Sequence, residues 1–182
     1  NILSVSGEYF GVEKTIEKKF DVFWKRAVGG SSGIYAGQTG GVTAGSCAHV
    51  SPVSVNSQEA SPQGIAFSND GTKMFISGGH LTTPSIYEYT LNGAFCIGTA
   101  SFVDSFSVAS QDSQPKNISF NKSGTKMFVV GIDGQDVNEY KLSTAWDVST
   151  ASFVDSFRVA NQETAPRGIA FDKTGKKMFI VG

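Results

Sequence analysis

Residues 62–78 read PQGIAFSNDGTKMFISG, and the pattern returns as PKNISFNKSGTKMFVVG at 115–131 and as PRGIAFDKTGKKMFIVG at 166–182. Successive copies begin 53 and 51 residues apart, and the two extra residues of the first unit lie between 78 and 86. A repeat of this length is typical of proteins that stack copies of one supersecondary unit. The repeat therefore predicts the architecture of residues 50–182.

Each unit contains four segments with strand patterns. The first reads GIAF or NISF, and a turn with a glycine, which closes a tight hairpin, follows it. The second, such as KMFVV, is apolar on consecutive residues, as expected of a strand that is covered on both faces. The third (IYEYTL or VNEYKL) alternates, and the fourth (SFVDSFSV or SFVDSFRV) admits charge. We therefore predict four-stranded antiparallel sheets whose burial decreases from the second strand to the fourth.

An all-β fold of such sheets, packed face to face around an axis with one blade per repeat, explains this gradient. The segment GIAFSNDGTKMFISG resembles the WD40-like and YVTN-type β-propeller repeats of bacterial surface and secreted proteins, and the resemblance covers residues 50–182. Asn69, Lys122 and Lys173 stand near the position where those repeats often carry proline. The sequence holds a leading fourth strand at 53–56, two full units and half of a third, whereas a closed ring takes about 4–8 blades. We expect an incomplete ring that further repeats or further copies complete.

The overall composition bounds the class of protein. With 40% apolar residues, 21 glycines and 14 phenylalanines, the chain reads as all-β with many turns. A net charge of −1 favours neither nucleic-acid binding nor attraction to a membrane surface. No apolar run approaches the ~20 residues of a membrane-spanning helix. The count of two cysteines, Cys47 and Cys96, favours two unpaired thiols over a disulfide.

The first 49 residues differ from the repeats. The apolar spacing within 12–27 fits either a helix or a strand. Residues 12–24, VEKTIEKKFDVFW, resemble short segments of tail-associated proteins of bacteriophages, and this resemblance favours strands. The segment 29–49 is rich in glycine, serine and threonine, which predicts a linker or an extended arm. The expected organisation is an anchoring segment at 1–28, an arm at 29–49 and propeller repeats at 50–182. Because the chain lacks an initiator methionine and ends directly after an apolar strand, we expect it to be part of a longer protein.

Strand ends alternate between two faces of an antiparallel sheet, so the loops between units share a face with the loops that join second and third strands. Because loops can vary without disturbing the stack, this is the candidate binding face. Its polar side chains are Gln58, Glu59, His80, Thr82, Gln111, Asp112, Asp133, Gln135, Asp136, Gln162 and Glu163. The recurring pairs of glutamine and acid either face a ligand or cation or bond to backbone at each junction, and their recurrence with the repeat favours the second role. The loop at 131–136 has no distal glutamate of a calcium loop, so no metal is predicted.

On the opposite face, Phe95 and Trp146 align 51 residues apart. They either stack on a sugar or a partner or fold back against their own unit, and the second is favoured. The histidines, His49 and His80, stand in no catalytic motif, and a nucleophile needs a neighbouring base. No catalytic residue and no cofactor is therefore predicted.

These features favour a non-catalytic structural or adhesive β-propeller of an extracellular particle, most specifically a bacteriophage tail or tail-fibre component of the virion. The expected partners are other structural subunits, further copies of the chain, and a glycan or protein of the host surface. Neither a nucleic-acid partner nor membrane insertion is expected. A secreted or cell-surface bacterial propeller that binds protein or glycan is the first alternative. A propeller enzyme of lactonase-like type is the second.

Overall fold

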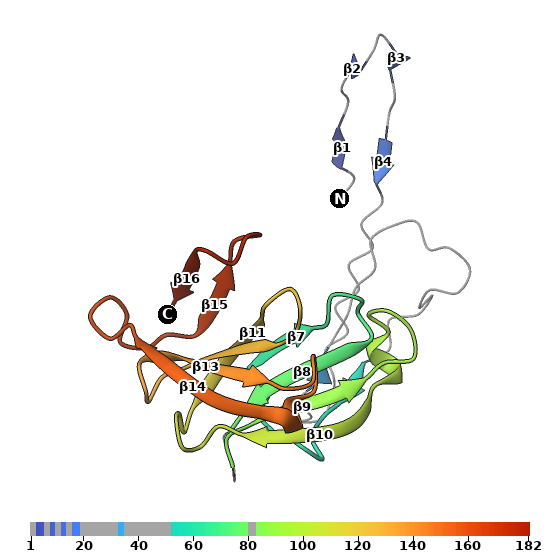
Figure 1. Cartoon of the computed structure of the whole chain (residues 1–182). Helices are drawn as coiled ribbons and strands as arrows, with labels where there is room; N and C mark the ends of the chain where they lie inside the picture. The colour runs from blue at the N-terminus through green and yellow to red at the C-terminus, as the bar shows by residue number, and fades with distance from the viewer. Residues whose placement is uncertain are drawn as a thin grey trace.

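The computed structural model describes residues 52–79 and 83–182, together with the backbone of short strands before residue 52. These residues form an all-β structure of antiparallel sheets (Figure 1). The first sheet, in the order β10-β9-β8-β7, contains β7 (Gly64–Phe67), β8 (Lys73–Gly78), β9 (Ser85–Thr90) and β10 (Ser101–Ser107). The second, in the order β11-β12-β13-β14, contains β11 (Pro115–Phe120), β12 (Lys126–Gly131), β13 (Asp136–Leu142) and β14 (Ala151–Arg158). The third unit contributes the hairpin β15 (Gly168–Phe171) and β16 (Met178–Val181).

The two four-stranded sheets confirm the repeat predicted from the sequence. The inner strands of three successive units lie next to one another, because β11 contacts β7 and β8 on one side and β15 on the other. In each complete unit a one-turn 3-10 helix precedes the fourth strand: η1 (Ile97–Thr99) and η2 (Val148–Thr150). Among the described residues the sheets do not close into a ring.

The N-terminal segment contains short paired strands. They are β1 (Leu3–Val5) with β4 (Ile16–Lys18), and β2 (Glu8–Tyr9) with β3 (Val12–Glu13). Part of the predicted 12–27 element is thus strand, as favoured above, and residues 19–28 lie outside the described part. Within the predicted arm, β5 (Gly33–Ile34) pairs with β6 (Val53–Ser54), the start of the expected leading strand.

Burial follows the predicted gradient. Strand β8 is buried on both faces: Met74 and Ile76 lie in a cluster on one side of the first sheet, and Phe75 lies in the cluster between the two sheets. The fourth strands, β10 and β14, are largely exposed. Consecutive apolar residues in the second strand therefore reflect two packed faces, as expected of an inner strand.

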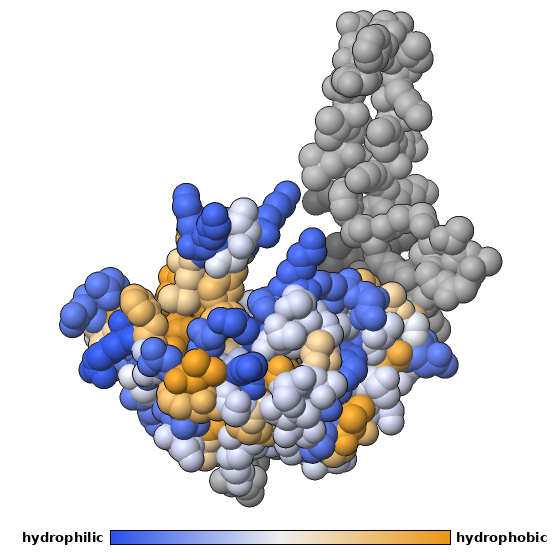
Figure 2. Space-filling model, in the orientation of Figure 1, coloured by the Kyte–Doolittle hydropathy of each residue, from blue (hydrophilic) through white to orange (hydrophobic). Residues whose placement is uncertain are grey.

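The outer strands keep large apolar side chains at the surface. In both, the register shifts at the same point of the repeat, at Val103 in β10 and at Val154 in β14. Such bulges bend a strand and make an exposed edge a poorer template for pairing with another chain. Figure 2 shows hydrophobic surface on the sheets and on the β15–β16 hairpin.

The expectation of two unpaired thiols is wrong. Cys96 is disulfide-bonded and lies buried ahead of η1. Cys47, the other cysteine of the sequence, lies outside the described residues. The count alone could not decide this, because pairing depends on how close the tertiary structure brings two distant positions.

Candidate functional site

Each loop that joins two repeats is held by one carboxylate. Glu59 accepts the backbone N–H of Ser61 at 2.7 Å, and Glu163 accepts that of Ala165 at 2.8 Å. Asp112 accepts the N–H of Gln114 at 2.5 Å and, with its second oxygen, that of Gly134 at 2.9 Å. Glu59 and Asp112 are almost completely buried. These acids therefore bond to backbone inside the fold. This is the second of the two roles considered from the sequence, and the one that their recurrence with the repeat favours.

The glycine that ends each repeat motif is explained by the same carboxylates. A Cβ at Gly78 would overlap the Glu59 carboxylate, and a Cβ at Gly131 would overlap that of Asp112. The third copy has the same arrangement, with Glu163 against Gly182. In all three units the acid precedes its glycine by 19 residues. This constant spacing was the signal that reasoning from the sequence missed.

The glutamines beside these acids contact buried tyrosines. The hydroxyl of Tyr89 donates to Gln58 Oε1 at 3.4 Å, and that of Tyr140 donates to Gln111 Oε1 at 3.3 Å. Burial, followed by neighbouring negative groups, raises the pKa of both tyrosines. The phenols therefore stay neutral donors, and the two glutamines satisfy them. In the third unit, Gln162 is exposed.

The loop between β12 and β13 brings several predicted residues together. Asp133 accepts hydrogen bonds from the Ser113 hydroxyl and from Gln114 Nε2, the latter at 2.9 Å. Gln135 Nε2 donates to the backbone oxygen of Thr164 at 3.0 Å, so it reaches the next junction. Asp136 accepts from Asn138 Nδ2 at 2.8 Å.

The acids of this loop gather no further metal ligands among the described residues. Burial, with a smaller contribution from the charge of Asp112, raises the pKa of Asp136. In the part of the chain that the structure describes, no group of three histidines, cysteines or acids could hold a metal ion. His80 and Thr82, the remaining predicted residues of this face, lie outside the described residues.

A pocket of about 370 Å³ opens on the candidate binding face between the first and second units. It is lined by Gln63, Gly79, Ser113, Gln114, Pro115 and Lys116. Lys116 Nζ lies 3.4 Å from Gln63 Oε1. Amide, hydroxyl and ammonium groups of this kind can bond to hydroxyls or carboxylates of a ligand. Among the described lining residues there is neither a histidine nor an acid that could act as a general base.

On the opposite face, Phe95 and Trp146 fold back against their own units. The N–H of Phe95 donates to the carbonyl of Gly71 at 2.7 Å, and that of Trp146 donates to Gly124 at 2.9 Å. Each ring lies against the glycine of the hairpin turn, where a Cβ would collide with it. Both aromatics are positioned as covers of a turn, and Phe95 remains 53% exposed.

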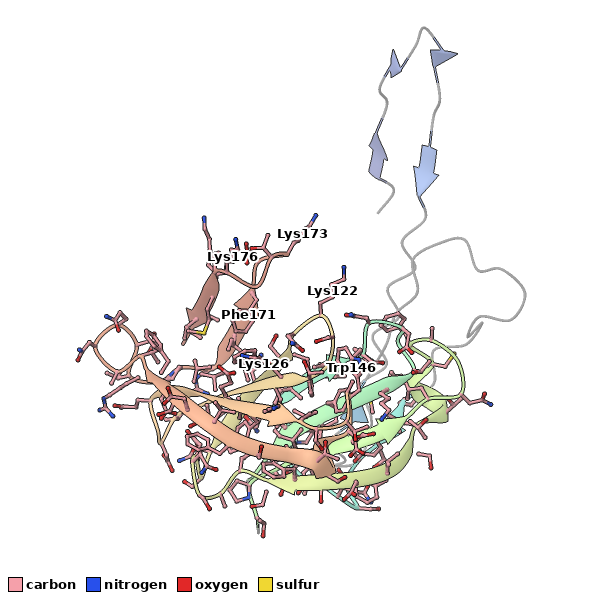
Figure 3. All side chains as sticks on the ribbon, in the orientation of Figure 1. Lys122, Lys126, Trp146, Phe171, Lys173 and Lys176 are labelled. Carbon is pink, nitrogen blue, oxygen red and sulfur yellow. The ribbon has the colours of Figure 1, made fainter. Side chains whose placement is uncertain are left out.

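A larger groove, of about 1190 Å³, lies on this face between the second sheet and the third hairpin. Figure 3 shows Lys122 and Lys173 projecting from the neighbouring turns, with Lys126 and Phe171 below them. The groove is lined by residues of three hairpin turns and of the strands beneath them, chiefly Asn69, Phe120, Lys122, Lys126, Phe128, Phe171, Lys173 and Gly175. The sequence did not predict this groove, because residues of different units form it together.

The chain matches no model of a protein family and no curated protein. Among solved structures, it is similar to a functionally unknown protein from Desulfotomaculum acetoxidans DSM 771, with 19% identity, a TM-score of 0.51 and 73% of this chain covered. It is also similar to a complex of KlAtg21 with the coiled-coil of AgAtg16, with 13% identity, a TM-score of 0.52 and 75% covered. The match spans 41% of each of those chains. At these identities the likeness shows the fold alone.

In the described residues, no helix is long and apolar enough to cross a membrane.

Proposed function

We propose that residues 50–182 form part of a β-propeller that serves as a non-catalytic structural or adhesive module. One observation carries the proposal: the recurring acids Glu59, Asp112 and Glu163 are engaged in hydrogen bonds to the backbone of the loops that join the repeats. The lateral contacts of β11 with β7 and β15 support a radial arrangement of blades. Repeat proteins that present a binding surface keep the same scaffold hydrogen bonds in each unit, while their loops vary.

The candidate binding face is the surface we assign to recognition. Its pocket offers Gln63, Ser113 and Lys116, which suit the hydroxyls of a glycan or the polar groups of a protein. The test is binding of the 182-residue chain to an array of surface glycans, compared with Lys116→Ala. We expect the wild-type chain to bind and the variant to bind at least several-fold more weakly. Turnover of lactones or other ester substrates would contradict a non-catalytic role and favour the lactonase-like alternative.

We place this module, as a finer proposal, in the tail or tail fibre of a bacteriophage, where it contributes to attachment. The support is the resemblance of residues 12–24 to tail-associated proteins. The short strands of this segment are compatible with an anchor. Antibodies against the chain should label purified virions, with several copies per particle. Failure to label them, with labelling of the cell envelope instead, would contradict it.

A secreted or cell-surface bacterial protein is the second candidate. The observation in its favour is the disulfide at Cys96, because such bonds persist mainly in oxidising compartments. Titration of free thiols in the protein isolated from its source under alkylating conditions would separate the two settings. A fully oxidised Cys96 favours secretion, and a reduced one favours assembly in the cytoplasm.

A further inference from the structure

An ion pair of the first unit clamps a backbone segment of the second. Lys73 Nζ donates to Glu88 Oε1 at 2.6 Å and to the carbonyl of Trp146 at 2.8 Å. The other oxygen of Glu88 accepts the N–H of Val148 at 2.9 Å. We call Lys73 and Glu88 the first clamp. It holds one carbonyl and one N–H of the turn that carries Trp146, and the Glu88 side chain is only 1% exposed.

The seated tryptophan packs between two units. Its ring lies 6.1 Å from that of Phe75 on β8 and 5.2 Å from that of Phe120 on β11, measured between centroids. The two phenylalanines are themselves 4.5 Å apart. The ring also covers Gly124, the glycine of the β11–β12 turn. The seat of Trp146 therefore consists of the clamp, a pair of phenylalanines from neighbouring units, and a turn glycine.

The second unit contains the same clamp one repeat later. Lys126 Nζ lies 2.6 Å from Glu139 Oε1, in the positions that correspond to Lys73 and Glu88. We call this pair the second clamp. Its side chains are 51% and 27% exposed. Among the described residues, Lys126 Nζ donates to Glu139 alone, and no backbone segment bridges the pair.

The rest of the seat is also repeated around the second clamp. Phe128 on β12 and Phe171 on β15 form a tilted pair with centroids 4.7 Å apart, like Phe75 and Phe120. A Cβ built at Gly175 would meet nothing within 4 Å among the described residues. These groups line the groove of about 1190 Å³ beside Lys126. The groove therefore repeats, with its polar and apolar parts in the same order, the surroundings of Trp146.

We propose that this groove is the docking site for the aromatic turn of a further half-unit, contributed by polypeptide that continues the third repeat. The carbonyl of its aromatic residue accepts from Lys126, and the N–H two residues later donates to Glu139. The ring packs on Phe128 and Phe171 and covers Gly175. Continuation of the same repeat is the favoured source because Trp146 belongs to the unit whose own turn it covers. A second copy would have to release its own Trp146 from the first clamp.

The solved structures similar to this chain are consistent with such a continuation, because the match spans only 41% of each of them. The inference rests on the repeat architecture of the proposed function and is independent of the adhesive role. The two proposals can therefore fail separately, since docking is measured without any glycan or virion.

The test extends the chain with its own second half-unit. Residues 132–159 are fused after Gly182, which occupies the position of Gly131, so that the added turn has the register of the Trp146 turn. Lysine acetylation is then followed by mass spectrometry in the original and the extended proteins. We expect Lys126 to become at least tenfold less reactive in the extended protein, while Lys141, which is exposed on β13 and does not line the groove, is unchanged. Lys73 is the internal control, because its clamp is occupied in both proteins.

A variant distinguishes docking of the added turn from nonspecific shielding of Lys126 by the added segment. Lys126→Ala should change the stability of the original protein little, since the exposed pair contributes little there. In the extended protein it should lower the folding equilibrium constant of the added segment about tenfold or more, the effect of losing a charge-assisted hydrogen bond.

Three results would overturn the proposal. The first is a Lys126 reactivity that is the same in the extended and the original proteins, and the second is an added segment that remains protease-sensitive. The third is protection of Lys126 in the original protein that grows with its concentration, which would assign the groove to a second copy.

Discussion

The two four-stranded sheets and the third hairpin are built from the same motif, yet among the described residues only the two sheets have a following unit packed against their second strand. Phe75 is completely buried, whereas Phe179, at the same motif position, is 57% exposed. Val130 is likewise buried and its counterpart Val181 is 66% exposed. The difference teaches that the motif specifies a strand with two apolar faces, and that the neighbouring unit decides whether both become core.

The largest contrast is expected from removing the two equivalent rings. Phe75→Ala should lower the free energy of unfolding by about 3–5 kcal/mol, because it opens a cavity between packed sheets. Phe179→Ala should cost about 1 kcal/mol, in proportion to the smaller apolar surface that it buries. Denaturation in urea, monitored by circular dichroism, measures both. Equal losses would show that the third hairpin is packed in solution as tightly as the first.

The two clamps provide a second contrast. Glu88→Ala leaves Lys73 and the N–H of Val148 without their buried acceptor, so we expect a loss of about 3–5 kcal/mol. Glu139→Ala breaks a more exposed pair and should cost about 0.2–1 kcal/mol. Thermal unfolding of both variants at the same salt concentration tests this. A loss for Glu139→Ala that matches Glu88→Ala would mean that the second clamp is also engaged.

Alanine substitutions at the two turn glycines distinguish the cost of backbone strain from the cost of displacing the ring of Trp146. Gly124 and Gly175 both have φ of 69°, in the left-handed region. Alanine at Gly175 should cost about 1–2 kcal/mol from backbone strain alone. Alanine at Gly124 should cost more, because its Cβ also displaces the ring of Trp146. Trp146 fluorescence should shift for Gly124→Ala and stay unchanged for Gly175→Ala, and a shift in the second variant would contradict the assignment.

The smallest effect concerns pH. Hydrogen bonds from the Thr174 hydroxyl and then from the N–H groups of Lys177 and Lys176 lower the pKa of Asp172 below its usual value of 3.8. Because the pKa of Asp172 is lower in the folded state, its ionised carboxylate stabilises the fold at pH values above the usual pKa. This stabilisation is lost as the pH falls through the lowered pKa of the folded state. As the pH falls below about 4, the amide protons of Lys176 and Lys177 should therefore lose protection.

The matched turn in the second unit is the control for this titration. There Asn121 Oδ1, which does not titrate in this range, accepts the N–H groups of Thr125 and Lys126. Amide exchange in this turn should not change over the same pH interval. Asp172→Asn should make the third turn equally insensitive. If it remained pH-dependent, another group would be responsible.

The sequence predicted much of the architecture and less of the candidate site. The strands and their order of burial follow from period and polarity, which are local properties. The pairing of Glu59 with Gly78, and of Asp112 with Gly131, was visible only as a constant spacing, since its meaning depends on a contact. The groove beside Lys126 could not be predicted, because Phe128 and Phe171 belong to different units and only packing brings them together.

By itself, the sequence determined the repeat, the four strands of each complete unit and the turn glycines, because backbone preference and apolar alternation act within a few residues. The tertiary structure alone decided which copies of the motif become core, that Cys96 is disulfide-bonded, and that Lys73 and Glu88 hold the turn of Trp146. The physical reason is that burial and hydrogen-bond satisfaction are properties of neighbours in space. Identical segments such as those around Phe75 and Phe179 therefore differ in everything that depends on the next sheet.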